Sequence, residues 1–307
     1  MDFDVKQDFD IFQSILIKRP EINPDNLKKD LNNYYLPFIQ KLIKLKLQRN
    51  LHQGIIVGVS AIQGAGKTTQ GEILEILLEH LGYSSIPLSI DDHYITHEEL
   101  NRLRVKDPRF IRRGVTHDIP KAIKNLTDLK NMKDGMEVKI PIYDKGAKSG
   151  DGDRVGFRTI NQKPHFIFYD GWMLGAKRVE DESIFESGLP ALDTSEHIQF
   201  AKDINRKLDE YIPLWDLIDF MLVLYVLNYQ ISLTWREQAE ERLRAEGKGM
   251  SQQQIKEFVY YFWRSVHPAI QIKNLAYDKN TDQVVIINDD HTIGKIMTPK
   301  QVKMMYP

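Results

Sequence analysis

The chain of 307 residues contains no cysteine. Disulfide bonds, thiolate nucleophiles and zinc sites built on cysteine are therefore excluded. An excess of one charge is also missing, since 42 Lys and Arg residues stand against 43 Asp and Glu residues, for a formal net charge of -1. Surfaces that bind nucleic acid depend on clustered positive charge, so this balance predicts no nucleic-acid partner.

Long hydrophobic runs are absent as well. No apolar stretch of the sequence approaches the roughly 20 residues that a membrane-spanning helix needs. The first ten residues, MDFDVKQDFD, are acidic where a targeting peptide would be basic. We therefore expect a soluble, cytoplasmic protein with no membrane partner. Hydrophobic residues make up 42% of the chain, which is enough for a substantial core.

Short apolar runs alternate with helical patterns along most of the chain. The runs typical of buried strands lie at 54–60, 85–90, 165–169, 220–226 and 284–288. Helical spacing of apolar residues occurs at 24–50, from 67 to 81, and in a segment after Ser251, where Ser251 and Gln254 match a capping box. This alternation is typical of an α/β fold with a parallel sheet flanked by helices. We predict a single domain over 1–307, with an N-terminal helical extension at 1–53 and a helical lid at 228–250.

A phosphate-binding loop lies between the first strand and the helix that follows it. Residues 61–68 read AIQGAGKT and match the pattern G-x-x-x-x-G-K-[ST], with Ala61 in place of the first glycine. Backbone N–H groups of such a loop surround phosphate, Lys67 reaches the β- and γ-phosphates, and the Thr68 hydroxyl ligates Mg²⁺. The sequence therefore predicts a P-loop NTPase-type fold with ATP and Mg²⁺ as cofactors. The expected nucleotide-binding residues are Gln63, Gly64, Ala65, Gly66, Lys67, Thr68 and Thr69.

Aspartates follow two of the predicted strands. Asp91 and Asp92 end the second strand, and Asp170 ends the third. Ligands of open α/β sheets bind at the carboxyl ends of the strands, where one carboxylate can orient an acceptor hydroxyl and another can hold Mg²⁺. The alternative is that these residues only cap helices or turns. No N-K-x-D segment of the kind that reads guanine is present, so the pattern favours a kinase over a GTPase.

Further blocks of sequence resemble one family. They are SIDDHY at 89–94, RGVTHD at 113–118, PIYDKGAKSGDGDR at 141–154, GWMLG at 171–175 and WREQAE at 235–240. Together with the loop, they resemble the D-glycerate 3-kinase family, within the P-loop kinase superfamily of uridine kinase, phosphoribulokinase and pantothenate kinase. The resemblance spans about 54–268. Three departures are Asp170 in place of the family's usual Glu, His93 in place of Phe, and an R-G segment one residue shorter before His117.

The resemblance implies roles for individual residues. Asp91 matches the catalytic base, while Lys67 and Arg236 would stabilise the charge of the transferring phosphoryl group. Asp170 matches the carboxylate on the metal side and would act with Thr68. The alternative for Arg236 is a solvated helix face on which it pairs with glutamates such as Glu237.

The acceptor would be a small anion, which needs a pocket of cations or hydrogen-bond donors. The candidate substrate-binding residues are His117, Tyr143, Lys145, Arg154 and Trp172, with Tyr143 and Trp172 as walls. Each has an alternative: His117 as a structural hydrogen-bonding group, and Lys145 and Arg154 as surface charges.

Three functions follow from these observations. The resemblance implies that ATP and D-glycerate give 3-phosphoglycerate and ADP. A second possibility is a kinase of another small hydroxyl compound, such as a nucleoside or pantothenate. The third is a P-loop ATP-binding regulatory protein with no small-molecule acceptor. From chain order alone, the segment 284–292 is expected near the adenine.

Overall fold

The centre of the molecule is a six-stranded sheet in the order β2-β5-β1-β6-β7-β8. The computed structural model describes residues 8–49, 52–245 and 249–307. The strands of this sheet are β1 (Ile55–Ala61), β2 (Ser85–Ser89), β5 (Phe166–Gly171), β6 (Phe220–Tyr225), β7 (Gln283–Ile287) and β8 (Ile293–Met297). All neighbouring strands pair in parallel except β7 and β8, which are antiparallel. The predicted α/β fold is confirmed, with a mixed rather than a fully parallel sheet.

The central strands are buried on both faces. Every residue of β1 and of β6 is buried, which explains their continuous apolar sequences. The prediction that 284–288 is the last strand was wrong, because β8 follows it at the edge of the sheet. Three of the five residues of β8 are exposed, and its sequence IGKIM gives little apolar signal.

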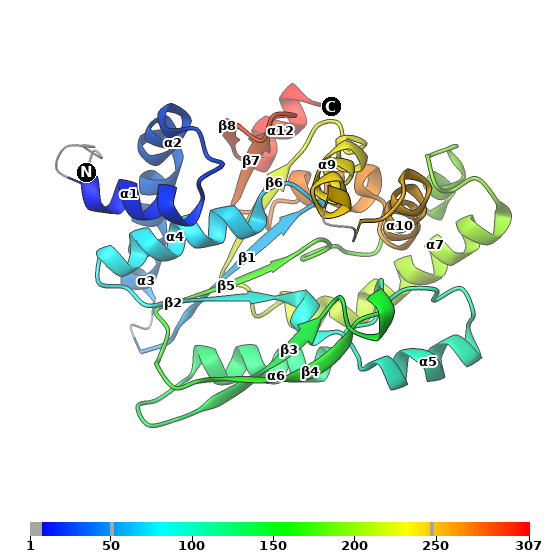
Figure 1. Cartoon of the computed structure of the whole chain (residues 1–307), viewed down its shortest axis with the longest axis horizontal. Coiled ribbons are helices and arrows are strands. Elements are labelled where there is room, and N and C mark those ends of the chain that lie inside the picture. The colour runs from blue at the N-terminus through cyan, green and yellow to red at the C-terminus, as the bar shows by residue number, and fades with distance from the viewer. Residues whose placement is uncertain (1–7, 50–51, 246–248) are drawn as a thin grey trace.

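Helices cover the sheet on both sides (Figure 1). They are α1 (Phe9–Lys18), α2 (Pro24–Asp30), α3 (Leu36–Gln48), α4 (Lys67–His80), α5 (His97–Lys106), α6 (Ile119–Lys130), α7 (Ser195–Lys207), α8 (Ile212–Trp215), α9 (Ile231–Ala245), α10 (Gln252–Ser265), α11 (Lys273–Tyr277) and α12 (Pro299–Met305). The predicted capping box is confirmed at the start of α10, where the Ser251 side chain accepts from the Gln254 N–H. The helix α1 lies within the predicted helical extension, whereas α5, α6, α7, α8, α11 and α12 had not been predicted.

The glycine-rich segment belongs to a second, two-stranded sheet. Strands β3 (Val138–Asp144) and β4 (Asp153–Ile160) form an antiparallel hairpin that lies apart from the main sheet in Figure 1. The sequence pattern indicates a strand at 137–140 and a glycine-rich loop at 146–156, so β3 was predicted in part and β4 was missed. Gly152 has a φ of 85°, and a Cβ there would lie 2.5 Å from Cε1 of Tyr143. A side chain at this position would push the loop off the Tyr143 ring.

The two ends of the chain pack into the same core as the sheet. One buried apolar cluster includes Ile11 and Leu31 of the N-terminal region, Val57 of β1 and Val302 of α12. Of the predicted extension 1–53, residues 1–7 and 50–51 lie outside the described residues, as do 246–248 of the predicted lid. Across the described part of the chain, no helix is both long and apolar enough to cross a lipid bilayer.

Candidate nucleotide and phosphoryl-transfer site

The phosphate loop connects the end of β1 to the start of α4. Gly64 and Gly66 adopt φ angles of 87° and 88°, in the left-handed region that side chains disfavour. A Cβ on Gly64 would also lie 2.9 Å from Cβ of Trp235, so α9 packs directly against the loop at this point. The loop therefore needs glycine at this position for its conformation and for its contact with α9.

The side chain of Lys67 folds back over this loop. Its ammonium group donates to the carbonyl oxygens of Ala61 at 2.9 Å and Ile62 at 3.2 Å. These contacts use only the backbone of Ala61, which explains why the missing glycine does not disturb them. Burial lowers the pKa of Lys67, while the negative charges of Asp170 and Asp91 oppose that change. Lys67, Asp91 and Asp170 thus interact electrostatically in one site.

The two aspartates after β2 have different roles in the structure. The carboxylate of Asp92 accepts from the N–H of Ser89 at 3.2 Å and completes a capping box on the short helix Ile90–His93. Asp92 therefore caps a helix, as the alternative interpretation of these aspartates expected. Asp91, one residue earlier, makes no such contact with its side chain.

Asp91 instead faces Lys145 of the loop in the β3–β4 hairpin. Its Oδ2 lies 2.5 Å from the Lys145 ammonium, while Oδ1 is buried without a hydrogen-bond partner among the described residues. Burial alone would raise the pKa of Asp91, but the charge and hydrogen bond of Lys145 and the charge of Lys67 bring it below its ordinary value. The carboxylate is therefore ionised at neutral pH and has one oxygen available to accept a hydrogen bond.

Asp170 lies in β5, paired in register with Val59 of β1 and Ser89 of β2. Its Oδ1 accepts from the Ser89 hydroxyl at 3.1 Å. Burial raises the pKa of Asp170, and the Lys67 charge only partly opposes this. A cavity of about 190 Å³ is lined by Lys67, Thr68 and Asp170, so the predicted metal-side residues share one space.

Aromatic rings and His117 form a wall next to Asp91. The His117 ring stacks on Tyr94 with centroids 4.3 Å apart, and its Nδ1 lies 2.8 Å from the Tyr211 hydroxyl. Burial lowers the pKa of His117 to about 3, although Asp91 opposes that shift, so the imidazole is neutral at pH 7. Its Nε2 is buried with no partner among the described residues. His117 therefore offers one free hydrogen-bonding atom and no charge.

The other two predicted wall residues flank the same tyrosine. Trp172 donates from Nε1 to the Tyr94 hydroxyl at 3.1 Å, and the Tyr143 ring lies 5.2 Å from the Tyr94 ring. Tyr94 had not been assigned to the site, although it is part of the SIDDHY block. It connects three of the predicted residues, and an aromatic residue shortly after the base was the signal that could have revealed it.

Arg154 and Arg236 are each held by a neighbouring carboxylate. The Arg154 guanidinium donates to the Tyr94 carbonyl at 2.9 Å and to Asp118 at 3.3 Å. Arg236 pairs with Glu240 at 2.5 Å and lies over the ring of Phe258, 4.9 Å from its centroid. The Nε atom of each arginine is buried without a hydrogen-bond partner among the described residues. The partner of Arg236 is thus Glu240, whereas Glu237 pairs with Arg244.

The loop that carries Lys145 is fixed by two arginines of a basic run that the sequence suggested would either draw in an anionic substrate or be solvated. Arg104 donates to both carboxylate oxygens of Asp151 at 2.7 and 3.0 Å. The buried Arg113 donates to the carbonyls of Gly150 and Asp151 at 3.3 and 2.9 Å. Arg104 of α5 and Arg113, which follows that helix, therefore hold the loop in position, a function that only long-range contacts reveal.

The chain is similar to several known proteins, although no protein-family model matches it. It is 30% identical over 291 residues to the chloroplastic D-glycerate 3-kinase of Arabidopsis thaliana, covering 88% of this chain and 61% of that protein. It is also 30% identical over 237 residues to the uncharacterized kinase mug58 of Schizosaccharomyces pombe, covering 73% and 84% of the two chains. This chain thus spans about three-fifths of the plant relative.

A solved structure gives the same relationship. The D-glycerate 3-kinase of Cryptococcus neoformans superposes with a TM-score of 0.75 at 25% identity, over 85% of this chain and 96% of the other. The match therefore extends over nearly the whole of a solved family member, and it agrees with the loop geometry and the sequence relatives. This chain belongs to the D-glycerate 3-kinase family of P-loop kinases.

Proposed function

We propose that this protein transfers the γ-phosphoryl group of ATP to a hydroxyl of D-glycerate, giving 3-phosphoglycerate and ADP. The observation that carries the proposal is Asp91, whose Oδ1 is buried beside Lys67 and Asp170 with no partner among the described residues. A buried carboxylate oxygen with no donor is costly unless a substrate supplies one. A small acceptor with a free hydroxyl provides the missing hydrogen bond.

The reaction needs few chemical groups from the protein. Asp91 accepts a hydrogen bond from the acceptor hydroxyl, aligns it with the γ-phosphorus and takes its proton as the new P–O bond forms. Lys67 leaves the loop carbonyls for the phosphate oxygens and stabilises their charge as the bond to ADP breaks. Arg236, on the helix that packs against the loop, is the predicted second cation for this charge.

Thr68 and Asp170 fit a magnesium ion that is bound mainly by phosphate and water. Within the described residues, no group of three or more His, Cys, Asp or Glu side chains could hold a metal by itself. Mg²⁺ in kinases takes only one or two protein ligands, so one hydroxyl and one carboxylate that line a common cavity are sufficient. The ion would neutralise charge on the transferred phosphoryl group.

The carboxylate of glycerate needs donors near the acceptor hydroxyl. Lys145 carries a positive charge next to Asp91, and Arg154 and His117 each have one buried nitrogen that no described residue pairs with. Together with the rings of Tyr143 and Trp172, these groups suit a small anion better than a large, neutral nucleoside. The acceptor carboxylate would compete with Asp91 for Lys145 and release the base for its hydroxyl.

An ADP-release assay over a panel of acceptors tests this proposal. The purified full chain is incubated with MgATP and either D-glycerate, uridine, pantothenate or no acceptor. We expect fast release with D-glycerate and little with the others. Equal release with and without glycerate would overturn the proposal and favour an ATP-binding regulatory protein, while release with uridine or pantothenate alone would indicate a different kinase. The cytoplasmic location is a separate prediction, checked by imaging a tagged chain.

A further inference from the structure

A cavity of about 500 Å³ opens beside the phosphate loop. Three parts of the chain line it: the N-terminal region with Asn26 and Asp30, the loop with Gly64 and Gly66, and the β7–β8 turn with His291. Its volume lies within the roughly 300–1,000 Å³ of small-molecule sites. Two other cavities also reach the segment formed by β1, the phosphate loop and α4, and their volumes are about 190 and 20 Å³. The large cavity is therefore the one of the three with room for a nucleoside attached to phosphates on the loop.

The N-terminal wall of this cavity is fixed to the helix that begins at the loop. Arg19 donates to the Thr69 hydroxyl, and its Nε lies 3.3 Å from Glu72. Lys18 pairs with Glu75 at 3.2 Å. Because positions 69, 72 and 75 lie on one face of α4, these contacts hold the N-terminal helices along that face. Figure 1 shows α1 running beside α4.

A second contact also joins the N-terminal region to α4. The Gln70 side-chain amide donates to the Tyr34 hydroxyl, in the π-helical turn Leu31–Tyr35 that joins α2 to α3. Tyr34 and Gln70 both line the large cavity. The wall is thus continuous from α2 to the first turn of α4.

Asp30 is the charged residue of this wall that lacks a partner. It is half-buried at the end of α2, its side chain makes no cap hydrogen bond, and no described residue donates to its carboxylate or pairs with it. Burial raises the pKa of Asp30 to about 6, and the charge of Lys29 only partly opposes this. A carboxylate that is partly withdrawn from water without gaining a donor can accept one from a ligand.

We propose that the N-terminal segment 19–35 forms part of the nucleotide site and that Asp30 accepts a hydrogen bond from the nucleoside half of the bound nucleotide. The donor is either the exocyclic amine of the base or a ribose hydroxyl. Arg19 is a positioning residue that holds this segment against α4. The inference rests on the proposed use of ATP and is independent of which acceptor is phosphorylated.

Calorimetric titration of the full chain with Mg²⁺ and the β,γ-imido analogue of ATP tests the inference. Asp30→Ala should weaken binding about tenfold, the effect of losing one hydrogen bond to a charged group. The matched control is Asp25→Ala, which removes a carboxylate from the exposed first turn of the same helix and should leave Kd unchanged. Equal Kd values for Asp30→Ala and the unmodified chain, at unchanged melting temperature, would overturn the proposal.

Three ATP analogues identify the donor. They are 2′-deoxy-ATP and 3′-deoxy-ATP, which each lack one ribose hydroxyl, and purine riboside triphosphate, which lacks the exocyclic amine. The unmodified chain should bind one of them more weakly than ATP, and Asp30→Ala should bind that analogue and ATP equally. Discrimination that persists in Asp30→Ala, or that is absent from the unmodified chain, would show that Asp30 does not contact the nucleoside.

Arg19→Met tests the positioning role. We expect a higher KM for ATP with kcat at saturating ATP unchanged, since Arg19 is placed to orient the wall rather than the reacting atoms. A fall in kcat at saturating ATP would contradict this role. Because the titrations contain no acceptor, their failure and the failure of glycerate as a substrate are separate results.

Discussion

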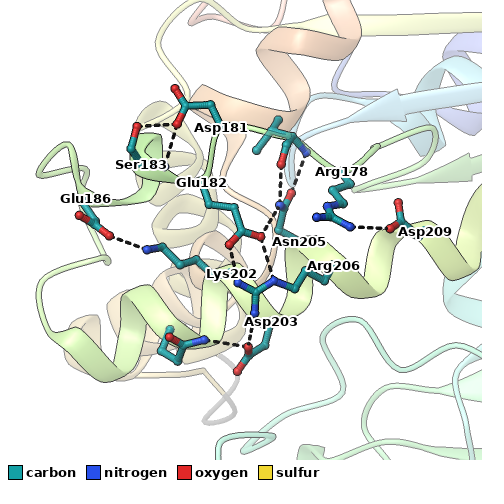
Figure 2. A network of polar contacts seen from close by, with 12 residues as sticks. Arg178, Asp181, Glu182, Ser183, Glu186, Lys202, Asp203, Asn205, Arg206 and Asp209 are labelled. Atoms are coloured by element: carbon teal, nitrogen blue, oxygen red, sulfur yellow. Dashed lines mark hydrogen bonds and ion pairs between the residues drawn. The ribbon is translucent and has the colours of Figure 1, made fainter.

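Two clusters of charged side chains in this molecule use their hydrogen-bonding capacity differently. In the cluster around α7, shown in Figure 2, each labelled carboxylate is paired with a donor. Glu182 accepts from Arg206 and Asn205, and Asp209 accepts from Arg178. In the site beside the phosphate loop, by contrast, Asp91 keeps a buried oxygen that has no partner in the described part of the chain. The carboxylates of the first cluster are satisfied without a ligand, although the Arg178 Nε there has no partner among the described residues, whereas the Asp91 carboxylate is only half satisfied.

This difference separates stabilising charges from charges kept for a substrate. The α7 cluster is largely exposed, and ion pairs in water contribute about 0.2–1 kcal/mol each. A buried group without a partner costs stability in the free protein, of the order of 1–3 kcal/mol. A ligand that supplies the missing hydrogen bond removes this cost. Changes in the site should therefore affect activity, and changes around α7 should affect stability slightly and activity not at all.

The largest effect is expected from Asp91→Asn. Loss of a general base lowers kcat by about 10²- to 10⁴-fold. The affinity for ATP and the melting temperature should change little, because Lys145, the ion-pair partner of the carboxylate, is itself exposed. Steady-state kinetics with D-glycerate and a thermal melt measure both. Full activity in this variant would show that Asp91 is not the base.

Lys145→Met should have the next largest effect. Removing a cation that meets the acceptor carboxylate raises the KM for glycerate by tenfold or more, since a hydrogen bond to a charged group contributes about 1.5–3 kcal/mol. The control is Lys148→Met in the same loop, where the side chain is exposed. Equal KM values for the two variants would mean that Lys145 does not bind the acceptor.

The burial of His117 should make the folded protein less stable in acid. His117 has a pKa of about 3 in the folded protein against 6.5 for an exposed group, so the unfolded chain takes up the proton first as the pH falls below 6.5. Between pH 7 and 5, this costs about 2 kcal/mol of unfolding free energy. In urea titrations, the unfolding free energy of the His117→Gln variant should fall over that pH range by about 2 kcal/mol less than that of the unmodified chain. An identical pH dependence in both proteins would show that His117 is not buried as a neutral group.

The smallest effect is expected from Arg206→Met in the α7 cluster. Its guanidinium is half-exposed and pairs with Glu182 and Asp203. We expect a loss of at most about 1 kcal/mol in unfolding free energy and unchanged kinetics. A change in kcat as large as that of Asp91→Asn would remove the distinction between the two clusters.

The parts of the site that could be predicted from the sequence are those that leave a short-range pattern in it. The strand, loop and helix around Lys67 are contiguous, and Asp91 and Asp170 follow or end strands whose carboxyl ends meet, so the sequence alone indicated that they lie together. The pairing of Lys145 with Asp91 joins residues 54 positions apart through a hairpin whose second strand was not predicted. The contact of Arg19 with Thr69 likewise depends on how α1 packs. Neither contact leaves a periodic signal in the sequence.

The most direct test of the account is the product formed from MgATP and D-glycerate. Phosphorus NMR of the complete reaction should show a new phosphate monoester coupled to the two C3 protons, in amounts equal to the ADP formed. The unpaired oxygen of Asp91 would then have a substrate hydroxyl as its partner. Inorganic phosphate as the sole new phosphorus signal, formed at the same rate without glycerate, would contradict the central claim.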